Sequence, residues 1–214
     1  MKKGLTLLVL LISLFGITAC EKNIEKAESE SKAQDVLEET ENVKSNILVV
    51  YFSRTGANYN VGNIEIGNSA MMASYIKDYL KADSFEIVPV KKYSDDYETT
   101  TAEAQKEKEE KARPEIKDKI ENFDDYDTIF IGYPIWWGDL PMIVYNFLES
   151  YNFNGKTVVP FNTHEGSGNA GTYETIKSKL PKANIKDGLA LQGVVARTES
   201  GKNETINWLK KLGY

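Results

Sequence analysis

The chain has 214 residues, of which 26 are Lys or Arg and 32 are Asp or Glu, so its formal net charge is −6 at pH 7. This mild acidity argues against a nucleic-acid partner, because binding to phosphate backbones needs a concentrated basic surface. Cys20 is the only cysteine, which excludes an intramolecular disulfide, a cysteine metal cluster and a C-x-x-C redox pair.

The first residues have the pattern of an export signal. Lys2 and Lys3 precede an almost wholly apolar run, Leu5 to Ile17, and small residues follow just before Cys20. This order is typical of a secretory signal, and the run is short for a spanning helix, which needs roughly 20 residues. The ending resembles the lipobox of bacterial lipoproteins, which implies a signal peptide over residues 1–19 and a lipid on Cys20. The alternatives are an uncleaved anchor and a signal cut by an ordinary peptidase.

Residues 20–45 are predicted to form a disordered, charged tether. The segment Glu21 to Ser45 holds eight acidic residues against four lysines and few large apolar ones, so it cannot bury enough surface to offset its ordering entropy. Without the two signal lysines the net charge is −8, and the tether contributes −4, which leaves about −4 for residues 46–214. We expect one folded domain there, held at the outer face of the cytoplasmic membrane by the lipid on Cys20.

The domain alternates short apolar runs with amphipathic segments. Such alternation indicates βαβ units and therefore an α/β fold with a right-handed, doubly wound parallel sheet and helices on both faces. The predicted strands are Ile47–Phe52, Ser84–Val90, Asp127–Tyr133, Lys156–Phe161 and Leu189–Ala196. The predicted helices are Ala70–Ala82, Thr99–Ala112, a short one at Ile116–Ile120, Met142–Tyr151, Tyr173–Leu180 and Glu199–Leu212.

A polar turn follows the first predicted strand. Ser53, Arg54, Thr55 and Gly56 offer hydroxyls, a cation and backbone N–H groups at the carboxyl end of a strand, where open α/β sheets bind ligands and often anions. An ordinary strand-to-helix turn would have much the same composition. Neither G-x-x-x-x-G-K-[ST] nor G-x-G-x-x-G is present, so a triphosphatase loop and a dinucleotide fingerprint are not indicated.

Two adjacent tryptophans follow the third predicted strand, in the loop Tyr133 to Pro141. Neighbouring side chains in an extended loop point apart, so at least one of Trp136 and Trp137 should face a ligand or solvent. Aromatic rings flank planar ligands well, and exposed large aromatic side chains tend to mark binding sites. The alternative is a structural aromatic corner.

A glycine-rich loop, Asn162 to Gly171, follows the fourth predicted strand. Glycines allow backbone N–H groups to approach a ligand closely. The loop holds the only histidine, His164, followed by Glu165, but not an H-E-x-x-H zinc motif. His164 is therefore either a local hydrogen-bonding residue or a ligand-facing and candidate catalytic one.

Together, the segments V-V-Y-F-S-R-T-G, G-Y-P-I-W-W-G and T-H-E-G-S-G resemble the flavodoxin-like FMN-binding proteins, in particular a bacterial branch with the paired tryptophans and an H-x-G-S-G loop. The resemblance covers residues 46–214 and implies strand order 2-1-3-4-5 and non-covalent FMN, with its phosphate in the first loop. It places the isoalloxazine ring between the second and third loops, against Pro134, Ile135, Trp136, Trp137, Gly138, Thr163, His164, Gly166, Ser167 and Gly168.

The first loop departs from the family pattern. The family's loop reads [ST]-x-T-G-N-[ST], whereas Ala57 follows Gly56 here, and omitting residues 57–67 would restore S-R-T-G-N-S. We infer an eleven-residue insertion that loops out, so that Asn68 and Ser69 return to the phosphate. The alternative is that Ala57 and Asn58 stay with the phosphate and that Asn68 and Ser69 only cap the next helix.

These patterns leave three functional hypotheses. The first is an FMN electron carrier at the membrane, whose redox donor and acceptor the sequence does not identify. The second is an FMN reductase that oxidises NAD(P)H and reduces a quinone-type acceptor. The third is a non-redox lipoprotein that binds another planar ligand, because a fold alone does not fix a function.

Overall fold

A computed structural model of the protein describes residues 46–214. The predicted signal peptide, Cys20 and the predicted tether lie outside these residues. Within the described part, no helix is both long and apolar enough to cross a membrane.

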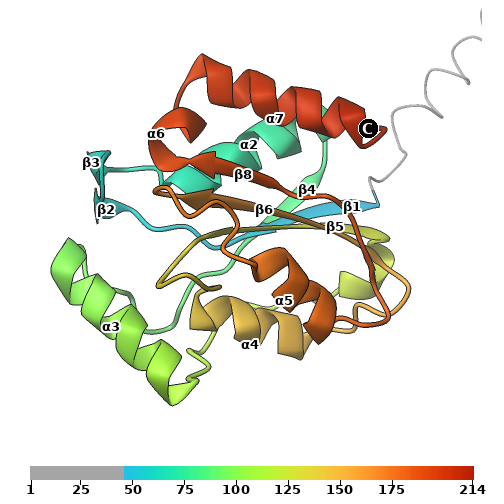
Figure 1. Cartoon of the computed structure of the whole chain (residues 1–214). Coiled ribbons are helices and arrows are strands. Elements are labelled where there is room, and N and C mark those ends of the chain that lie inside the picture. The colour runs from blue at the N-terminus through green and yellow to red at the C-terminus, as the bar shows by residue number, and fades with distance from the viewer. Residues whose placement is uncertain (1–45) are drawn as a thin grey trace, which may run out of the picture. The chain divides into compact units, whose positions relative to one another are not determined.

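The core of the domain is a parallel sheet, shown edge-on in Figure 1. Its strand order is β4-β1-β5-β6-β7, and β8 also pairs with β6. In chain order this is 2-1-3-4-5, with β7 and β8 sharing the fifth place, because β7 pairs with the start of β6 and β8 with its end. The strands are β1 (Ile47–Tyr51), β4 (Asp83–Glu86), β5 (Thr128–Pro134), β6 (Thr157–His164), β7 (Asn184–Ile185) and β8 (Leu189–Gln192). The predicted fold class and strand order are therefore confirmed.

Helices cover both faces of the sheet. On one face lie α2 (Asn68–Leu80), α6 (Gly193–Ala196) and α7 (Glu199–Lys211); on the other lie α3 (Tyr97–Glu110), α4 (Met142–Ser150) and α5 (Thr172–Lys179). One apolar cluster is built around Met72, Phe130 and Trp208, and the opposite one around Ile131, Phe147 and Ile176. Buried strands with apolar residues toward both faces require this double cover.

Three predicted elements differ from the structure. The predicted helix Ile116–Ile120 is wrong: Ile116 instead forms an antiparallel bridge with Pro89, because this segment runs beside the residues that follow β4 and Lys117 N–H donates to the carbonyl of Val88. The strand predicted at Ser84–Val90 is correspondingly shorter. The strand predicted at Leu189–Ala196 ends at Gln192, where the chain turns into α6.

The inserted segment after the first loop is a hairpin. Strands β2 (Gly56–Asn58) and β3 (Gly62–Ile64) pair antiparallel in a small sheet of their own. Figure 1 shows this hairpin beside the end of the main sheet at which α2 and α3 start. The insertion therefore has a defined structure at the edge where ligands bind in open α/β sheets.

Candidate functional site

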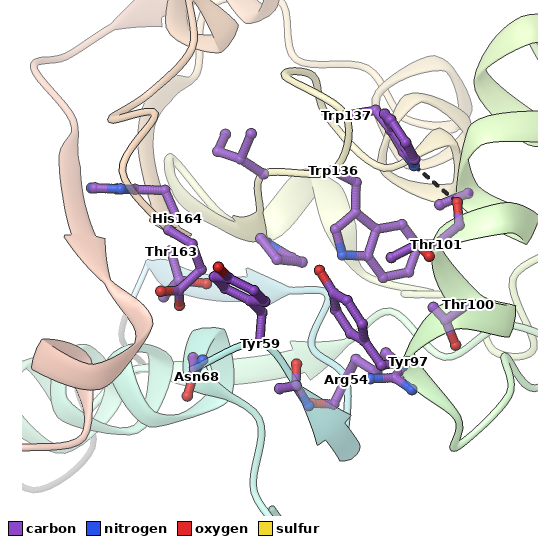
Figure 2. A pocket seen from close by; sticks show the side chains of 15 residues that line it. Arg54, Tyr59, Asn68, Tyr97, Thr100, Thr101, Trp136, Trp137, Thr163 and His164 are labelled. Carbon is purple, nitrogen blue, oxygen red and sulfur yellow. Dashed lines mark hydrogen bonds between the residues drawn. The ribbon is translucent and has the colours of Figure 1, made fainter. Parts of the chain in front are cut away.

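A cavity of about 470 Å³ opens where β1, β5 and β6 end. This volume is within the range of roughly 300–1,000 Å³ that small-molecule sites occupy. Its walls come from all three predicted loops and also from the hairpin and α3. The lining residues are Arg54, Asn58, Tyr59, Asn68, Tyr97, Thr100, Thr101, Ala104, Pro134, Ile135, Trp136, Trp137, Thr163, His164 and Glu165. Figure 2 shows them around the hollow.

The first loop and the start of α2 are packed tightly together. A methyl group on Gly67 would lie 2.2 Å from Ser53 Oγ and 2.5 Å from the carbonyl oxygen of Arg54, so only glycine fits there. Ser53 Oγ accepts a hydrogen bond from the N–H of Ala70 at 3.0 Å. The chain therefore returns to the first loop at Gly67, and Asn68 enters the cavity as the first residue of α2.

The residues of the two arrangements considered for the loop have different surroundings. Gly56 lies in the hairpin, where an added methyl group would meet the carbonyl oxygen of Asp95 at 2.9 Å. The N–H of Ala57 donates to that same oxygen and is not available to a ligand. Asn58 lines the cavity, but its amide donates to the carbonyl oxygens of Arg54 and Gly56. Gly56 and Gly67 are thus both close-packed. Gly67 packs against the first loop and is followed by Asn68 and Ser69, whereas Gly56 packs against Asp95.

Arg54 joins this loop to the segment before α3. Its guanidinium donates to the carbonyl oxygens of Ala57, Ser94 and Asp96. Burial lowers the pKa of Arg54, an effect that Asp95 and Asp96 oppose. Its Nε is buried and has no hydrogen-bond partner in the described part of the chain. Because this buried atom is closed off from solvent, what the side chain offers the adjacent cavity is its positive charge, which favours an anion.

The N-terminus of α2 provides a second favourable environment for an anion. No acidic residue lies in its first turn, and the end of a 13-residue helix carries a partial positive charge and N–H groups without helical partners. Ser69, at this turn, is buried and its Oγ lies 2.9 Å from Thr163 Oγ1. Ser69 therefore contacts β6, whereas Thr163 also lines the cavity.

The tryptophan loop folds into a tight turn. Trp136 and Asp139 exchange two backbone hydrogen bonds of 3.0 Å, and the two residues between them, Trp137 and Gly138, have φ values of 51° and 68°. Two positive φ values are the mark of a type I′ hairpin turn. The segment is therefore a tight turn and not the extended loop that the sequence suggested.

Each tryptophan is fixed by different partners. Trp136 packs edge-on against Phe52 and Tyr93, with ring centroids 5.2 and 5.1 Å away. Trp137 is 51% exposed, and its Nε1 donates to the carbonyl oxygen of Thr101 on α3, a bond drawn in Figure 2. Both rings still line the cavity.

A backbone hydrogen bond in the third loop favours one tautomer of neutral His164. Its Nδ1 accepts a hydrogen bond from the N–H of Gly166 at 2.9 Å, so the neutral ring carries its proton on Nε2. Partial burial lowers the pKa of His164, while Glu165 raises it to a smaller degree. A neutral imidazole that presents an N–H can donate a hydrogen bond to a ligand, but it is a poor general acid.

The structure brings part of the predicted site to the cavity. Arg54, Asn68, Pro134, Ile135, Trp136, Trp137, Thr163 and His164 line it, whereas its lining does not include Ser53, Thr55, Gly56, Ser69, Gly138, Gly166, Ser167 or Gly168. The latter support the loops or lie beside them. Asn58 was considered only in the alternative arrangement of the first loop, and Glu165 only as a residue that could orient a substrate with His164. Sequence reasoning missed Tyr59, Tyr97, Thr100, Thr101 and Ala104. Only Tyr59 carried a signal, as a large aromatic residue in the inserted segment.

No group of three or more His, Cys, Asp or Glu side chains in residues 46–214 could hold a metal ion. What these residues present instead is aromatic side chains beside one end of a cavity and a cationic, helix-terminal environment at another. This is an α/β protein whose site suits a planar ring that carries an anionic group.

Comparisons with known proteins agree with this class. The profile of a family described as Flavodoxin matches residues 46–212. A candidate flavoprotein from Bacteroides eggerthii is 32% identical, with a TM-score of 0.64 over 78% of this chain and 98% of that one. A similar protein from Bacteroides uniformis is 29% identical, with a TM-score of 0.63 over the same shares. The comparison with curated proteins returns no match.

The chain therefore belongs to the flavodoxin family. A flavoprotein from Lactobacillus acidophilus, solved in complex with FMN, shares the fold at 23% identity, with a TM-score of 0.54 over 72% of this chain and 96% of that one. FMN as the cofactor implied by the sequence is confirmed at the level of the family.

Proposed function

We propose that residues 46–214 bind FMN in the cavity and transfer electrons at the outer face of the cytoplasmic membrane. The observation that carries the proposal is that Trp136, Trp137 and the cationic side chain of Arg54 line one cavity. Membership of the flavodoxin family supports the same ligand. The residues present fit FMN, because each of its two ends has a matching environment.

The phosphate end would lie at the junction of the first loop and α2. Gly67 permits close approach of the backbone there, the helix terminus favours an anion, and Arg54 and Asn68 line the adjacent wall. Thr163, from β6, is on the same wall. These groups would hold the phosphate through hydrogen bonds, without a metal ion.

The ring end would lie against the tryptophan loop. Trp136 is held edge-on by Phe52 and Tyr93, so little side-chain entropy is lost when a planar ring packs on it. FMN supplies the redox chemistry when bound. The chain's own residues orient it, exclude water from one side and tune its potential through nearby charge, and electron transfer requires no acid or base from the protein.

The predicted export signal and the predicted lipid on Cys20 would put this chemistry outside the cytoplasm. Soluble NAD(P)H is scarce there, so a membrane-bound or protein donor suits the site better than a nicotinamide. The predicted tether would let the domain reach partners near the membrane surface. We propose an electron carrier on these grounds, with a quinone-type reductase and a non-redox binding protein as outcomes of the tests below.

The first test is an absorbance spectrum of the full-length chain in detergent, recorded after FMN is added and the excess is removed. A retained flavin band with a shifted or structured profile supports FMN binding. Protein that stays colourless, with no affinity for FMN, contradicts both redox functions and leaves the non-redox one.

A second measurement separates carrier from reductase. The FMN-loaded chain is mixed anaerobically with NADPH and, separately, with a chemical reductant. Bleaching by the chemical reductant alone supports a carrier. Rapid bleaching by NADPH, followed by steady turnover with a quinone, assigns a reductase instead.

The anchor has its own test. The wild-type chain and a Cys20→Ser variant are expressed in a bacterium and fractionated. We expect the wild type with the membranes, labelled by radioactive palmitate, and the variant without label. An unlabelled wild type would contradict lipidation.

A further inference from the structure

The inserted hairpin contributes residues to the cavity. Asn58 and Tyr59, at the end of β2 and in the turn that follows, both line it. Asn58 is fixed by two hydrogen bonds from its amide to the carbonyl oxygens of Arg54 and Gly56. The hairpin therefore forms part of the cavity wall and does not simply extend into solvent.

Tyr59 pairs with Tyr97 from the start of α3. Their ring centroids are 6.1 Å apart and their planes are tilted by 31°. Both rings line the cavity, and they are 56% and 39% exposed, so each presents a face that a ligand could cover. Figure 2 shows the two rings side by side, with Tyr59 nearer Thr163 and Tyr97 nearer Trp136.

The hairpin is attached on both sides of the cavity. At its tip, Asn60 Nδ2 donates to Glu165 Oε2 in the third loop at 3.0 Å. At its base, Arg54 donates to the carbonyl oxygen of Ala57 and to that of Ser94, before α3. The hairpin therefore bridges from the end of β6 to α3, and this bridge holds Tyr59 over the cavity.

We propose that Tyr59 and Tyr97 form a second aromatic wall that contacts the flavin ring, and that the hydrogen bond between Asn60 and Glu165 holds this wall closed over the ligand. The inference rests on the proposed FMN binding and names additional residues of that site. A planar ring between Trp136 and the two tyrosines would cover apolar surface that is exposed in the free protein. The wall would retain the ligand by slowing its release.

The test compares FMN with riboflavin, which has the same ring and no phosphate. Dissociation constants of both are measured by flavin fluorescence for the full-length wild type, Tyr59→Ala and Tyr59→Phe. Loss of an aromatic contact should weaken both ligands by the same factor, roughly three- to tenfold, and the phenylalanine variant should stay within about twofold of the wild type. Tyr79→Ala, which removes a similarly exposed tyrosine from α2, is the matched control.

Each outcome has a distinct meaning. If the wild type binds neither ligand, the proposed function fails, and the inference fails with it. If the wild type binds but Tyr59→Ala binds as well as Tyr79→Ala does, the ring contact is refuted and FMN binding stands. If Tyr59→Ala weakens FMN but not riboflavin, the hairpin acts on the phosphate end, which also overturns the ring contact.

The hydrogen bond at the tip is tested separately. Asn60 has φ of 60°, so Asn60→Gly removes the amide without straining the turn. We expect FMN to dissociate several times faster from this variant, as measured by stopped-flow release into excess apoflavodoxin. Asn63→Gly, at an exposed position of β3, is the control. Equal dissociation rates in the two variants would show that the tip contact does not hold the ligand.

Discussion

The hydroxyls of Ser69 and Thr163 lie 2.9 Å apart. They join the first turn of α2 to the end of β6, and both side chains are buried. The sequence predicts that Ser69 helps to hold the phosphate. In the structure its hydroxyl is hydrogen-bonded to Thr163, and this bond links the start of α2, which follows the first loop, to the end of β6. Ser69 is therefore expected to act on the site through Thr163.

This relationship predicts a coupled effect on stability. Ser69→Ala should lower the free energy of unfolding by about 1–3 kcal/mol, because it leaves the Thr163 hydroxyl buried without its partner. Thr163→Val alone should have a similar cost. The double variant should cost clearly less than the sum, since both polar groups are then gone. Urea denaturation of the four proteins measures the coupling, and additive losses would contradict it.

Gly67 makes a prediction about ligand binding. Gly67→Ala places a methyl group 2.2 Å from Ser53 Oγ and 2.5 Å from the Arg54 carbonyl oxygen, so the first loop must move away from α2. We expect FMN affinity to fall by roughly tenfold or more, a loss of at least ~1.4 kcal/mol of binding free energy. Titration with FMN measures it.

Gly155→Ala is the control for this variant. Gly155 has φ of 78° and no atom within 4 Å of an added methyl group, so the substitution costs roughly 1–2 kcal/mol through backbone strain alone. It should leave FMN affinity unchanged. Equal affinities of the two variants would show that the close packing at Gly67 has no role in the site.

The sequence predicted the parallel sheet well, because its buried strands are continuous apolar runs such as Ile47–Tyr51 and Thr128–Tyr133, and such runs report burial on both faces. It failed at Ile116, where apolar residues in a short charged segment suggested a helix. The observed bridge to Pro89 depends on a neighbour far along the chain. Local propensity does not contain that information.

Part of the candidate site could also be predicted from the sequence, namely the residues that directly follow strands. Trp136 and His164 follow strands, and the carboxyl ends of parallel strands meet at one edge. Tyr97 and Thr101 were missed, because they reach the cavity only through the position of α3, and a highly charged helix shows little in its sequence of what it packs against. The return of the chain at Gly67 likewise depends on its contact with Ser53.

The position of Lys108 leads us to expect an effect on the reduction potential of bound FMN. Its Nζ donates to the carbonyl oxygen of Trp137 at 2.6 Å and lies 3.8 Å from Asp139 Oδ2. Lys108→Met removes a positive charge beside the tryptophan turn, so the negative charge added on reduction is less stabilised. We expect the midpoint potential of bound FMN to fall by roughly 10–30 mV, or ~0.5–1.4 kcal/mol for a two-electron couple.

Spectroelectrochemical titration measures this shift. Lys106→Met is the matched control, because Lys106 lies on the same helix and its ammonium group pairs only loosely with Glu110, at 3.9 Å. The same fall in both variants would assign the effect to net charge. No fall in Lys108→Met would show that the tryptophan turn is not close to the ring.

The surroundings of His164 predict the tautomer of its ring and a pH dependence of the free energy of unfolding. Because the N–H of Gly166 donates to Nδ1, the neutral ring should be protonated at Nε2. Burial lowers the pKa of the folded state below the ordinary value of 6.5. At pH values between the lowered pKa of folded His164 and 6.5, the unfolded chain binds more protons than the folded one. The free energy of unfolding should therefore decrease as the pH falls through this window.

His164 is the only histidine of the chain, so its imidazole signals in a ¹⁵N NMR titration need no assignment by mutation. We expect Nδ1 to have the shift of an unprotonated nitrogen at pH 7 and the ring to titrate below pH 6.5. His164→Gln should remove this histidine's contribution to the pH dependence of stability, leaving the acidic groups to act at lower pH. A pKa above the ordinary value, or a proton on Nδ1 at neutral pH, would show that the bond from Gly166 does not form in solution.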